Sequence, residues 1–452
     1  METNGVTQRD SFTGRIGIIA AVAGSAVGLG NIWKFPYITG VYGGGAFVLV
    51  YLICIAIIGL PVMLSEFTIG RKAQRNAVGS FKKLAPGKPW FLTGIMGIAA
   101  AFMILAFYGV VAGWTLEYLG KAVINSFAGK NPADLEGMFG GFISQIIRPI
   151  FWQFVFMGLT CWIVLAGIKG GIEKASKILM PVLLLIIVIL DIRAITLPGA
   201  GEGLSFLFKP DFSKLSAEGV LSALGHAFFS LSLGMGTLIT YSSYMGKNEN
   251  LGSMAIQCTV ADTGIALLAG IAIFPAVFAF GIEPGAGPGL VFITLPNVFQ
   301  QMPGGYIFSL LFFLLLAVAA LTSSISILEV VVAYFSEELK LARRNATIMA
   351  TIAITIVGIP CSLSMGAMSK VQFLGKTFFD WLDYIAANIL LPIGGLLIVA
   401  FVGWYLGYDK TKEEITNAGK LKAAYLPLFL FLAKFIAPLV IAIVFLHGLG
   451  LF

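Results

Sequence analysis

Eleven long apolar segments constrain this chain more than any other feature of its sequence. A membrane-spanning helix needs about 20 apolar residues, because the hydrocarbon core of a bilayer is about 30 Å thick. Backbone polar groups find no water in that core, so each spanning segment must satisfy its own hydrogen bonds as a helix. The sequence therefore predicts an all-α polytopic membrane protein embedded in a lipid bilayer. The segments lie at about 17–38, 44–69, 90–123, 150–168, 176–196, 217–245, 254–281, 304–338, 346–363, 377–407 and 424–450.

Charge is sparse in this chain and lies mostly between the apolar segments. Asp, Glu, Lys and Arg make up 11% of the residues, whereas soluble proteins contain about 25%. The net charge of +7 does not predict a nucleic-acid partner, because the Lys and Arg residues are not clustered on one basic face. The four cysteines show no metal-ligand spacing.

The basic residues between the segments predict how the chain crosses the membrane. With a cytoplasmic N-terminus, 19 of them lie on the inner side and 8 on the outer side, while Lys34 and Lys434 lie within segments. Lys and Arg concentrate on the cytoplasmic side of membrane proteins, so this count favours that orientation. We therefore expect a multi-pass protein of the inner (plasma) membrane with a cytoplasmic N-terminus.

Two of the apolar segments contain residues that interrupt a helix. The first segment contains GSAVGLGN at 24–31, and the sixth contains SLSLGMG at 230–236. Glycine weakens helices, and such irregular backbone persists at membrane depth only where it lines a cavity. Its unpaired carbonyls and amides can then bind cations and carboxylates. The alternative is that these glycines allow close helix packing, which does not explain the Ser and Asn residues beside them.

Five motifs stand in order along nearly the whole chain. They are GSAVGLGNIWKFPY at 24–37 with GGGAF at 43–47, Tyr108 six residues before Trp114, FFSLSLGMGTLITYSSY at 228–244, LTSSISILE at 321–329 and FFDWLDY at 378–384. Together they resemble the signatures of the neurotransmitter:sodium symporter family. The resemblance implies a LeuT-type fold, which is a 5+5 inverted repeat with an eleventh transmembrane helix. The single transporter domain, 1–452, would then comprise a first repeat at about 15–196, a second at about 217–407 and an extra helix at about 424–450.

The resemblance implies two sodium sites built from oxygen atoms, the ligands that hard cations prefer. Asp262 in the seventh segment is the candidate acidic ligand of the first site, which also takes the substrate carboxylate. The alternative is that Asp262 lies near the inner water boundary and caps its helix. A carboxylate at this site can balance the charge of sodium, so we expect no requirement for chloride. The implied ligands are Ala26, Asn31, Ser230 and Asp262 at the first site, and Gly24, Val27, Ala319, Thr322 and Ser323 at the second.

The same resemblance implies a substrate pocket for an amino acid between the spans. Tyr108 would hydrogen-bond the substrate carboxylate. Monoamine members of the family carry an Asp where this chain has Gly28, so the substrate must supply its own carboxylate. The apolar lining predicts a large hydrophobic or aromatic side chain. The implied pocket residues are Ala26, Leu29, Gly30, Ile104, Tyr108, Phe229, Ser230, Ser232, Met235, Ser323 and Ile327.

Charged side chains within membrane spans are costly and usually functional. The resemblance places Lys34 and Asp383 at an outer gate, where the family usually has Arg in the position of Lys34. A lysine lacks the bidentate fork of arginine, so this gate would be looser. Arg9 and Glu337 would form the inner gate. The alternative for Arg9 is an ordinary surface residue.

The sequence thus leads to a specific functional expectation. We expect a sodium-coupled symporter that imports hydrophobic or aromatic L-amino acids by alternating access. Two alternatives stay open, namely a symporter for small neutral amino acids and a non-transporting receptor or channel of the same fold. An enzyme is not expected, because the two histidines, His226 and His447, supply no nucleophile–base set.

Overall fold

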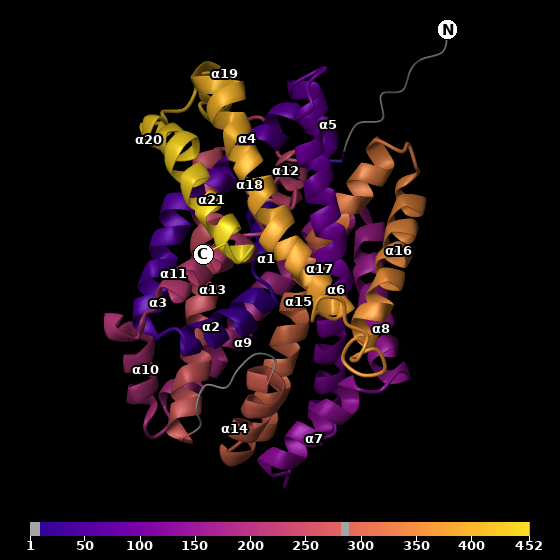
Figure 1. The fold of residues 1–452 in the computed structure, drawn as a ribbon, viewed down its shortest axis with the longest axis vertical. Helices are drawn as coiled ribbons and strands as arrows, with labels where there is room; N and C mark the ends of the chain where they lie inside the picture. Colours follow the sequence, from indigo (N-terminus) through magenta and orange to yellow (C-terminus); the bar gives the residue numbers. More distant parts are fainter. Residues whose placement is uncertain (1–9, 282–288, 452) are drawn as a thin grey trace.

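The computed structural model describes residues 10–281 and 289–451, and these residues form a bundle of helices (Figure 1). Within those ranges, strand-like pairing is limited to two isolated bridges. Nine of the described helices are long and apolar enough to cross a membrane, and the bent pair at the start of the chain makes ten. The all-α membrane fold predicted from the apolar segments is confirmed.

The continuous spans correspond to nine of the predicted segments. The shorter helices α5 (Ala77–Leu84), α7 (Pro132–Ile143), α10 (Ala200–Phe208), η4 (Phe212–Lys214) and α14 (Leu295–Gln301) lie between spans. Figure 1 places α5 and α19 at one end of the molecule, and α7, α10 and α14 at the opposite end. The spans are α3–α4 (Gly45–Ala73), α6 (Phe91–Val123), α8 (Ile147–Leu165), η3–α9 (Ile168–Ile195), α13 (Leu251–Ala279), α15 (Gly305–Glu337), α16 (Arg343–Leu363), α17–α19 (Phe378–Ile415) and α20–α21 (Leu426–Gly448).

The two predicted interruptions are real breaks. In the first span, α1 (Arg15–Ala26) is followed by η1 and α2 (Gly30–Val41), and the two parts meet at an angle of 50°. In the sixth, α11 (Ala217–Ser230) and α12 (Thr237–Ser242) are separated by residues 231–236. At about 1.5 Å per residue, neither α11 nor α12 can cross a bilayer alone, so together they take the position of the sixth predicted span.

Most of the π-helical turns in the spans directly precede a proline. Proline has no N–H, and its ring displaces the carbonyl four residues earlier, so the ladder of hydrogen bonds opens into a wider turn. The spans therefore stay helical but bend. The pairs are η1 (Gly30–Lys34) before Pro36, η2 (Ile55–Gly59) before Pro61, η5 (Leu290–Thr294) before Pro296, η6 (Ile385–Leu390) before Pro392 and η8 (Leu432–Ile436) before Pro438.

The tenth span runs further than its apolar pattern predicts. After η7 (Phe401–Leu406), the chain turns at Gly407, whose φ of +77° lies in the left-handed region. The polar helix α19 (Gly407–Ile415) follows and reaches beyond the predicted end at residue 407. Because α19 carries charged residues, its continuation could not be seen in the apolar pattern.

A buried ion pair joins two neighbouring spans, α15 and α16. Glu329 has no exposed surface, and its Oε2 lies 2.7 Å from Nη2 of Arg343 at the start of α16. The hydroxyl of Tyr244 donates a further hydrogen bond of 2.8 Å to Glu329 Oε1. The carboxylate is thus stabilised by one cation and one hydroxyl.

Removal of Arg343 is expected to destabilise the fold. In Arg343→Ala, Glu329 stays buried without its cation, which costs about 3–5 kcal/mol of folding free energy. The matched control is Lys82→Ala, which removes the more exposed ion pair of Lys82 with Glu338 and should cost about 0–1 kcal/mol. Thermal unfolding in detergent measures both variants. Equal unfolding midpoints for the two would contradict this account of Glu329.

Candidate sodium and substrate site

The two helix breaks lie against each other. Ser232 in the second break donates a hydrogen bond of 3.0 Å to the carbonyl oxygen of Ser25 in the first. The backbone N–H of Gly234 donates to Glu66 Oε1 at 2.8 Å. Gly234 has a φ of +79°, and a Cβ there would lie 2.5 Å from the carbonyl oxygen of Leu391. Glycine is therefore required at this position, both for the backbone conformation and for the close approach.

A buried polar cluster sits beside the breaks. Asn31, Ser230 and Asp262 are each no more than 1% exposed. Asn31 Nδ2 donates to Asp262 Oδ1 at 2.7 Å, and Ser230 Oγ donates to both carboxylate oxygens of Asp262, at 3.0 and 2.9 Å. The backbone N–H of Gly28 donates to Asn31 Oδ1 at 3.0 Å. A carboxylate, a hydroxyl and an amide oxygen thus lie together in an oxygen-rich cluster suited to a hard cation.

The position of Asp262 decides between the two interpretations of this residue. It lies in the middle part of α13, is fully buried, and contacts both broken spans. A helix cap at the inner water boundary would be exposed and close to the helix start, where Asn250 is the residue that accepts from the backbone of Ser253. The structure therefore excludes the capping interpretation, and the assignment of Asp262 to the first sodium site stays a prediction.

A second group of oxygens lies between α1 and α15. The hydroxyls of Thr322 and Ser323 donate to the carbonyl oxygen of Val27 at 3.3 and 3.1 Å. Thr322 also bonds the carbonyl oxygen of Ala319 at 3.0 Å, so helix back-bonding occurs here too. A Cβ on Gly24 would lie 3.5 Å from Cβ of Thr322. The five residues implied as ligands of a second sodium thus face one another across this interface.

Tyr108 reaches the first break from α6. The backbone N–H of Leu29 donates to the hydroxyl of Tyr108 at 3.3 Å. A Cβ on Gly28 would lie 2.3 Å from Ser323 Oγ and 3.1 Å from that hydroxyl. The chain has no room at Gly28 for a side chain, and hence no room for a protein carboxylate, without displacement of Ser323.

The apolar residues implied for the pocket come from five parts of the chain. Leu29 lies in the first break, Ile104 on α6, Met235 in the second break and Ile327 on α15, and all four are buried. Phe229 on α11 is half-buried, and its ring lies 3.4 Å from the position of a Cβ on Gly30. These side chains carry no charge.

The sequence matches known proteins over nearly its whole length. The model of the family described as the Sodium:neurotransmitter symporter family matches residues 9–132 and 143–451. Over 440 residues the chain is 42% identical to the sodium-dependent transporter YhdH of Bacillus subtilis, covering 97% of this chain and 98% of YhdH. This chain belongs to the sodium:neurotransmitter symporter family.

Two further proteins are similar over almost the whole chain. A sodium-dependent transporter of Haemophilus influenzae is 39% identical, with 99% of this chain and all of that protein covered. The crystal structure of MhsT in complex with L-phenylalanine is 48% identical in sequence and superimposes with a TM-score of 0.91, covering 98% of this chain and 100% of MhsT. This symporter is thus a sodium-dependent transporter with the LeuT-type fold, and it is not an enzyme.

The two residues of the symporter's implied outer gate are apart. Lys34 and Asp383 are both half-buried, and among the ion pairs of the described residues none joins them. Lys34 Nζ lies instead 4.6 Å from the centroid of the Phe229 ring. A cavity of about 240 Å³ between α11, η6 and α21 is lined by Lys34, Phe229 and His226, among others.

The symporter's inner gate is described in part, because Arg9 lies outside the described residues. Glu337 accepts hydrogen bonds from the backbone and side-chain nitrogens of Asn76, at 2.9 and 3.0 Å. Phe12 packs edge-on against the rings of Tyr241 and Tyr244. The residues just before α1 are thus packed against the α12 end of the sixth span.

Sequence reasoning missed Tyr51 and left the partner of Glu66 unassigned. Tyr51 donates a hydrogen bond of 3.3 Å to Ser230 and stacks near His226, with ring centroids 5.3 Å apart. Glu66 could be singled out as a charge inside a span, but nothing in the pattern identifies the backbone of Gly234 as its partner. A tyrosine in an apolar helix gives no comparable signal.

The second group of oxygens leads to a test with sodium. In a variant with both Thr322→Ala and Ser323→Ala, two hydroxyl ligands are lost, each comparable in free energy to a hydrogen bond of about 0.5–1.5 kcal/mol. The sodium concentration for half-maximal uptake should therefore rise by about tenfold or more. Ser324→Ala is the matched control, because Ser324 lies on the same helix but bonds Thr160. Unchanged sodium activation in the double variant would refute the second-site assignment.

Proposed function

We propose that this symporter couples the entry of sodium to the import of hydrophobic and aromatic L-amino acids by alternating access. The observation that carries the proposal is the absence of space for a protein carboxylate at Gly28, beside Tyr108 and Ser323. The substrate must therefore bring the carboxylate that completes the first sodium site. MhsT, a close relative in structure, was crystallised with L-phenylalanine, which is consistent with this substrate class.

The two ends of an amino acid find opposite partners in this arrangement. The hydroxyl of Tyr108 and the backbone N–H of Leu29 lie at the start of the helical segment that follows the first break. A helix start attracts negative charge, so the substrate carboxylate belongs there. Carbonyl oxygens freed at the two breaks, with Ser230 and Ser232 nearby, suit the ammonium group.

The side chain of the substrate then faces apolar residues. Leu29, Ile104, Phe229, Met235 and Ile327 come from the elements that meet at the breaks. Met235 is flexible and can adapt to ligands of different shape. This lining favours large hydrophobic and aromatic amino acids over small neutral ones.

Coupling follows from the shared carboxylate. We propose that sodium at Asn31, Ser230 and Asp262 binds the same carboxylate that Tyr108 holds, so each ligand raises the affinity for the other. Two repeats, at about 15–196 and 217–407, would each begin with one of the broken spans and move against each other around this fixed site. A channel or a receptor would need no such coupling.

The test of this function is uptake into proteoliposomes under an imposed sodium gradient. Labelled leucine, phenylalanine, tyrosine and tryptophan should accumulate, and should compete better than glycine or alanine. A decarboxylated analogue such as phenethylamine should bind at least about tenfold more weakly, because the first sodium loses a ligand. Comparable binding of amine and amino acid, or accumulation without sodium, would contradict the proposal.

Met235→Phe serves as a size control in the same assay. The bulkier ring should shift the preference towards smaller side chains while sodium dependence is retained. If glycine or alanine were preferred by the wild-type protein, the alternative of a symporter for small neutral amino acids would replace the one proposed. Binding without uptake would favour a receptor.

Chloride should be dispensable, because Asp262 supplies a fixed negative charge at the first sodium. Wild-type uptake is expected to be equal in sodium chloride and sodium gluconate. Asp262→Ser should lose most uptake in gluconate, and chloride should restore part of it. A chloride requirement in the wild type, or full activity of Asp262→Ser without chloride, would show that Asp262 is not the balancing charge.

Lys34 and Asp383 are proposed to pair when the outer gate closes. Lys34→Gln or Asp383→Asn alone leaves its partner without a counter-charge in the closed gate, so each should reduce uptake several-fold. The double variant should recover part of the activity. The interaction is measured as the departure from additivity in this double-mutant cycle, and a value of zero would argue against the gate.

A further inference from the structure

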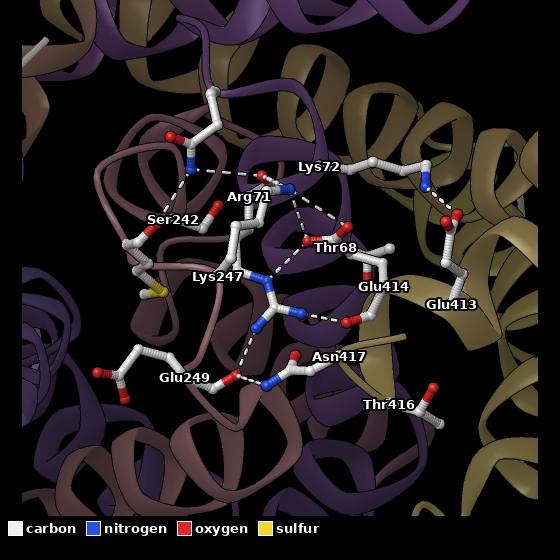
Figure 2. Close-up of polar contacts among 12 residues, drawn as sticks. Thr68, Arg71, Lys72, Ser242, Lys247, Glu249, Glu413, Glu414, Thr416 and Asn417 are labelled. Carbon is white, nitrogen blue, oxygen red and sulfur yellow. Dashed lines mark hydrogen bonds and ion pairs between the residues drawn. The ribbon is translucent and has the colours of Figure 1, made fainter. Parts of the chain in front are cut away.

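Arg71 lies at the centre of a polar cluster on the side of the molecule that holds the start of α1. Figure 2 shows the cluster, which joins the end of α4 (Leu60–Ala73), the loop between α12 and α13, and the end of α19. The Arg71 side chain is only 1% exposed, and its Nε lies 2.7 Å from Glu414 Oε1. Its two terminal nitrogens donate to the carbonyl oxygens of Glu249 and Glu414. Each of the three guanidinium nitrogens of Arg71 therefore donates a hydrogen bond to one of two other segments.

Two further side chains contribute to the same contact. Lys247 Nζ donates to the carbonyl oxygen of Arg71 at 2.7 Å and lies 3.2 Å from Glu414 Oε1. Asn417 Nδ2 donates to the carbonyl oxygen of Glu249 at 3.2 Å. Outside this core, Lys72 and Glu413 form a more exposed ion pair of 2.9 Å. The loop at 245–250 is thus held by side chains from both α4 and the tenth span.

Two of the segments held by this cluster are connected to the residues proposed for the first sodium site. On α4, Glu66 binds the backbone of Gly234 in the second break, five residues before Arg71. The loop at 245–250 leads directly into α13, which carries Asp262. The helix α4 therefore contacts both ends of the segment that runs from the second break to the start of α13.

The burial of the Arg71–Glu414 pair indicates that it does not open during transport. Separation would leave two charges buried without partners, which is strongly unfavourable. The ion pair of Lys82 with Glu338, between α5 and α15, differs because the Lys82 side chain is 53% exposed. An exposed pair of that kind can break at little cost. Of these two contacts, relative movement is therefore expected at Lys82–Glu338 and not at Arg71–Glu414.

We propose that the Arg71–Glu414 cluster stays closed through the whole transport cycle, so that α19 moves as one body with α4 and the loop at 245–250. The inference rests on the alternating-access function proposed above. Arg71 and Glu414 are then positioning residues, because they touch neither substrate nor sodium but determine which parts of the tenth span follow the sodium site.

A cross-link across the exposed edge of the cluster tests this inference. Lys72→Cys with Glu413→Cys can be bridged by a flexible bis-methanethiosulfonate reagent, which dithiothreitol releases. Cross-linked protein should take up substrate at a rate within about twofold of the reduced protein. Loss of uptake on cross-linking, with recovery on reduction, would overturn the inference. The wild type, whose four cysteines are buried or half-buried, and each single-cysteine variant, treated identically, are the controls.

The same experiment separates this inference from the proposed function. If wild-type protein shows no sodium-driven uptake, the proposed function fails. If wild-type uptake is normal and only the cross-linked double variant is blocked, the proposed function stands. The inference that α19 moves as one body with α4 and the loop at 245–250 is then wrong.

Substitution of Arg71 gives a second, independent readout. Arg71→Lys keeps the charge but lacks the planar fork that bonds Glu414 and Glu249 together. The looser cluster should lower the turnover per folded molecule at least about threefold, while KM for substrate and sodium changes by less than about twofold. Lys72→Arg, which keeps the exposed ion pair with Glu413, is the matched control. Wild-type turnover in Arg71→Lys would contradict a positioning role.

Discussion

Backbone groups that lie at membrane depth must find a partner within the protein, and this requirement governs the arrangement around the two broken spans. Four backbone groups freed at the breaks have such a partner. Gly234 N–H binds Glu66, and Gly28 N–H binds Asn31. The carbonyl oxygens of Ser25 and Val27 accept from hydroxyls of the second break and of α15. The breaks are therefore stabilised by α4 and α15, together with the partners that the two broken spans supply themselves.

The same partners make the breaks suitable for binding sodium. A hydroxyl that donates to a carbonyl can rotate and present its oxygen to a cation. The same hydroxyls can therefore bond the backbone when sodium is absent and bind sodium when it is present. Charge adds a further condition. Asp262 is fully buried and is held by Asn31 and Ser230, so a cation at this cluster would meet a carboxylate that is already positioned. This links the proposed independence of chloride to the geometry of the breaks.

The helix α4 connects this site to the end of the molecule at which α19 lies. Glu66 meets the second break and Arg71 meets the loop before α13, and both side chains are buried. A movement of the sodium site would therefore be transmitted along one rigid helix to α19. The half-exposed contacts between α5 and α15 have no such constraint. Rigid and mobile contacts are thus distinguished by burial of charge.

The sequence by itself determined the membrane class, the approximate limits of most spans and the location of both breaks, because these depend on local composition. Glycines with Ser and Asn inside apolar segments mark a break without any knowledge of neighbours. The family motifs extended this to the residues implied for the sodium and substrate sites. By contrast, only the tertiary structure decided that Asp262 faces Asn31, that Glu66 binds Gly234 and that Arg71 binds Glu414. These partners are 168 to 343 residues apart, and they meet because of how the helices pack, which no local pattern of apolar residues encodes.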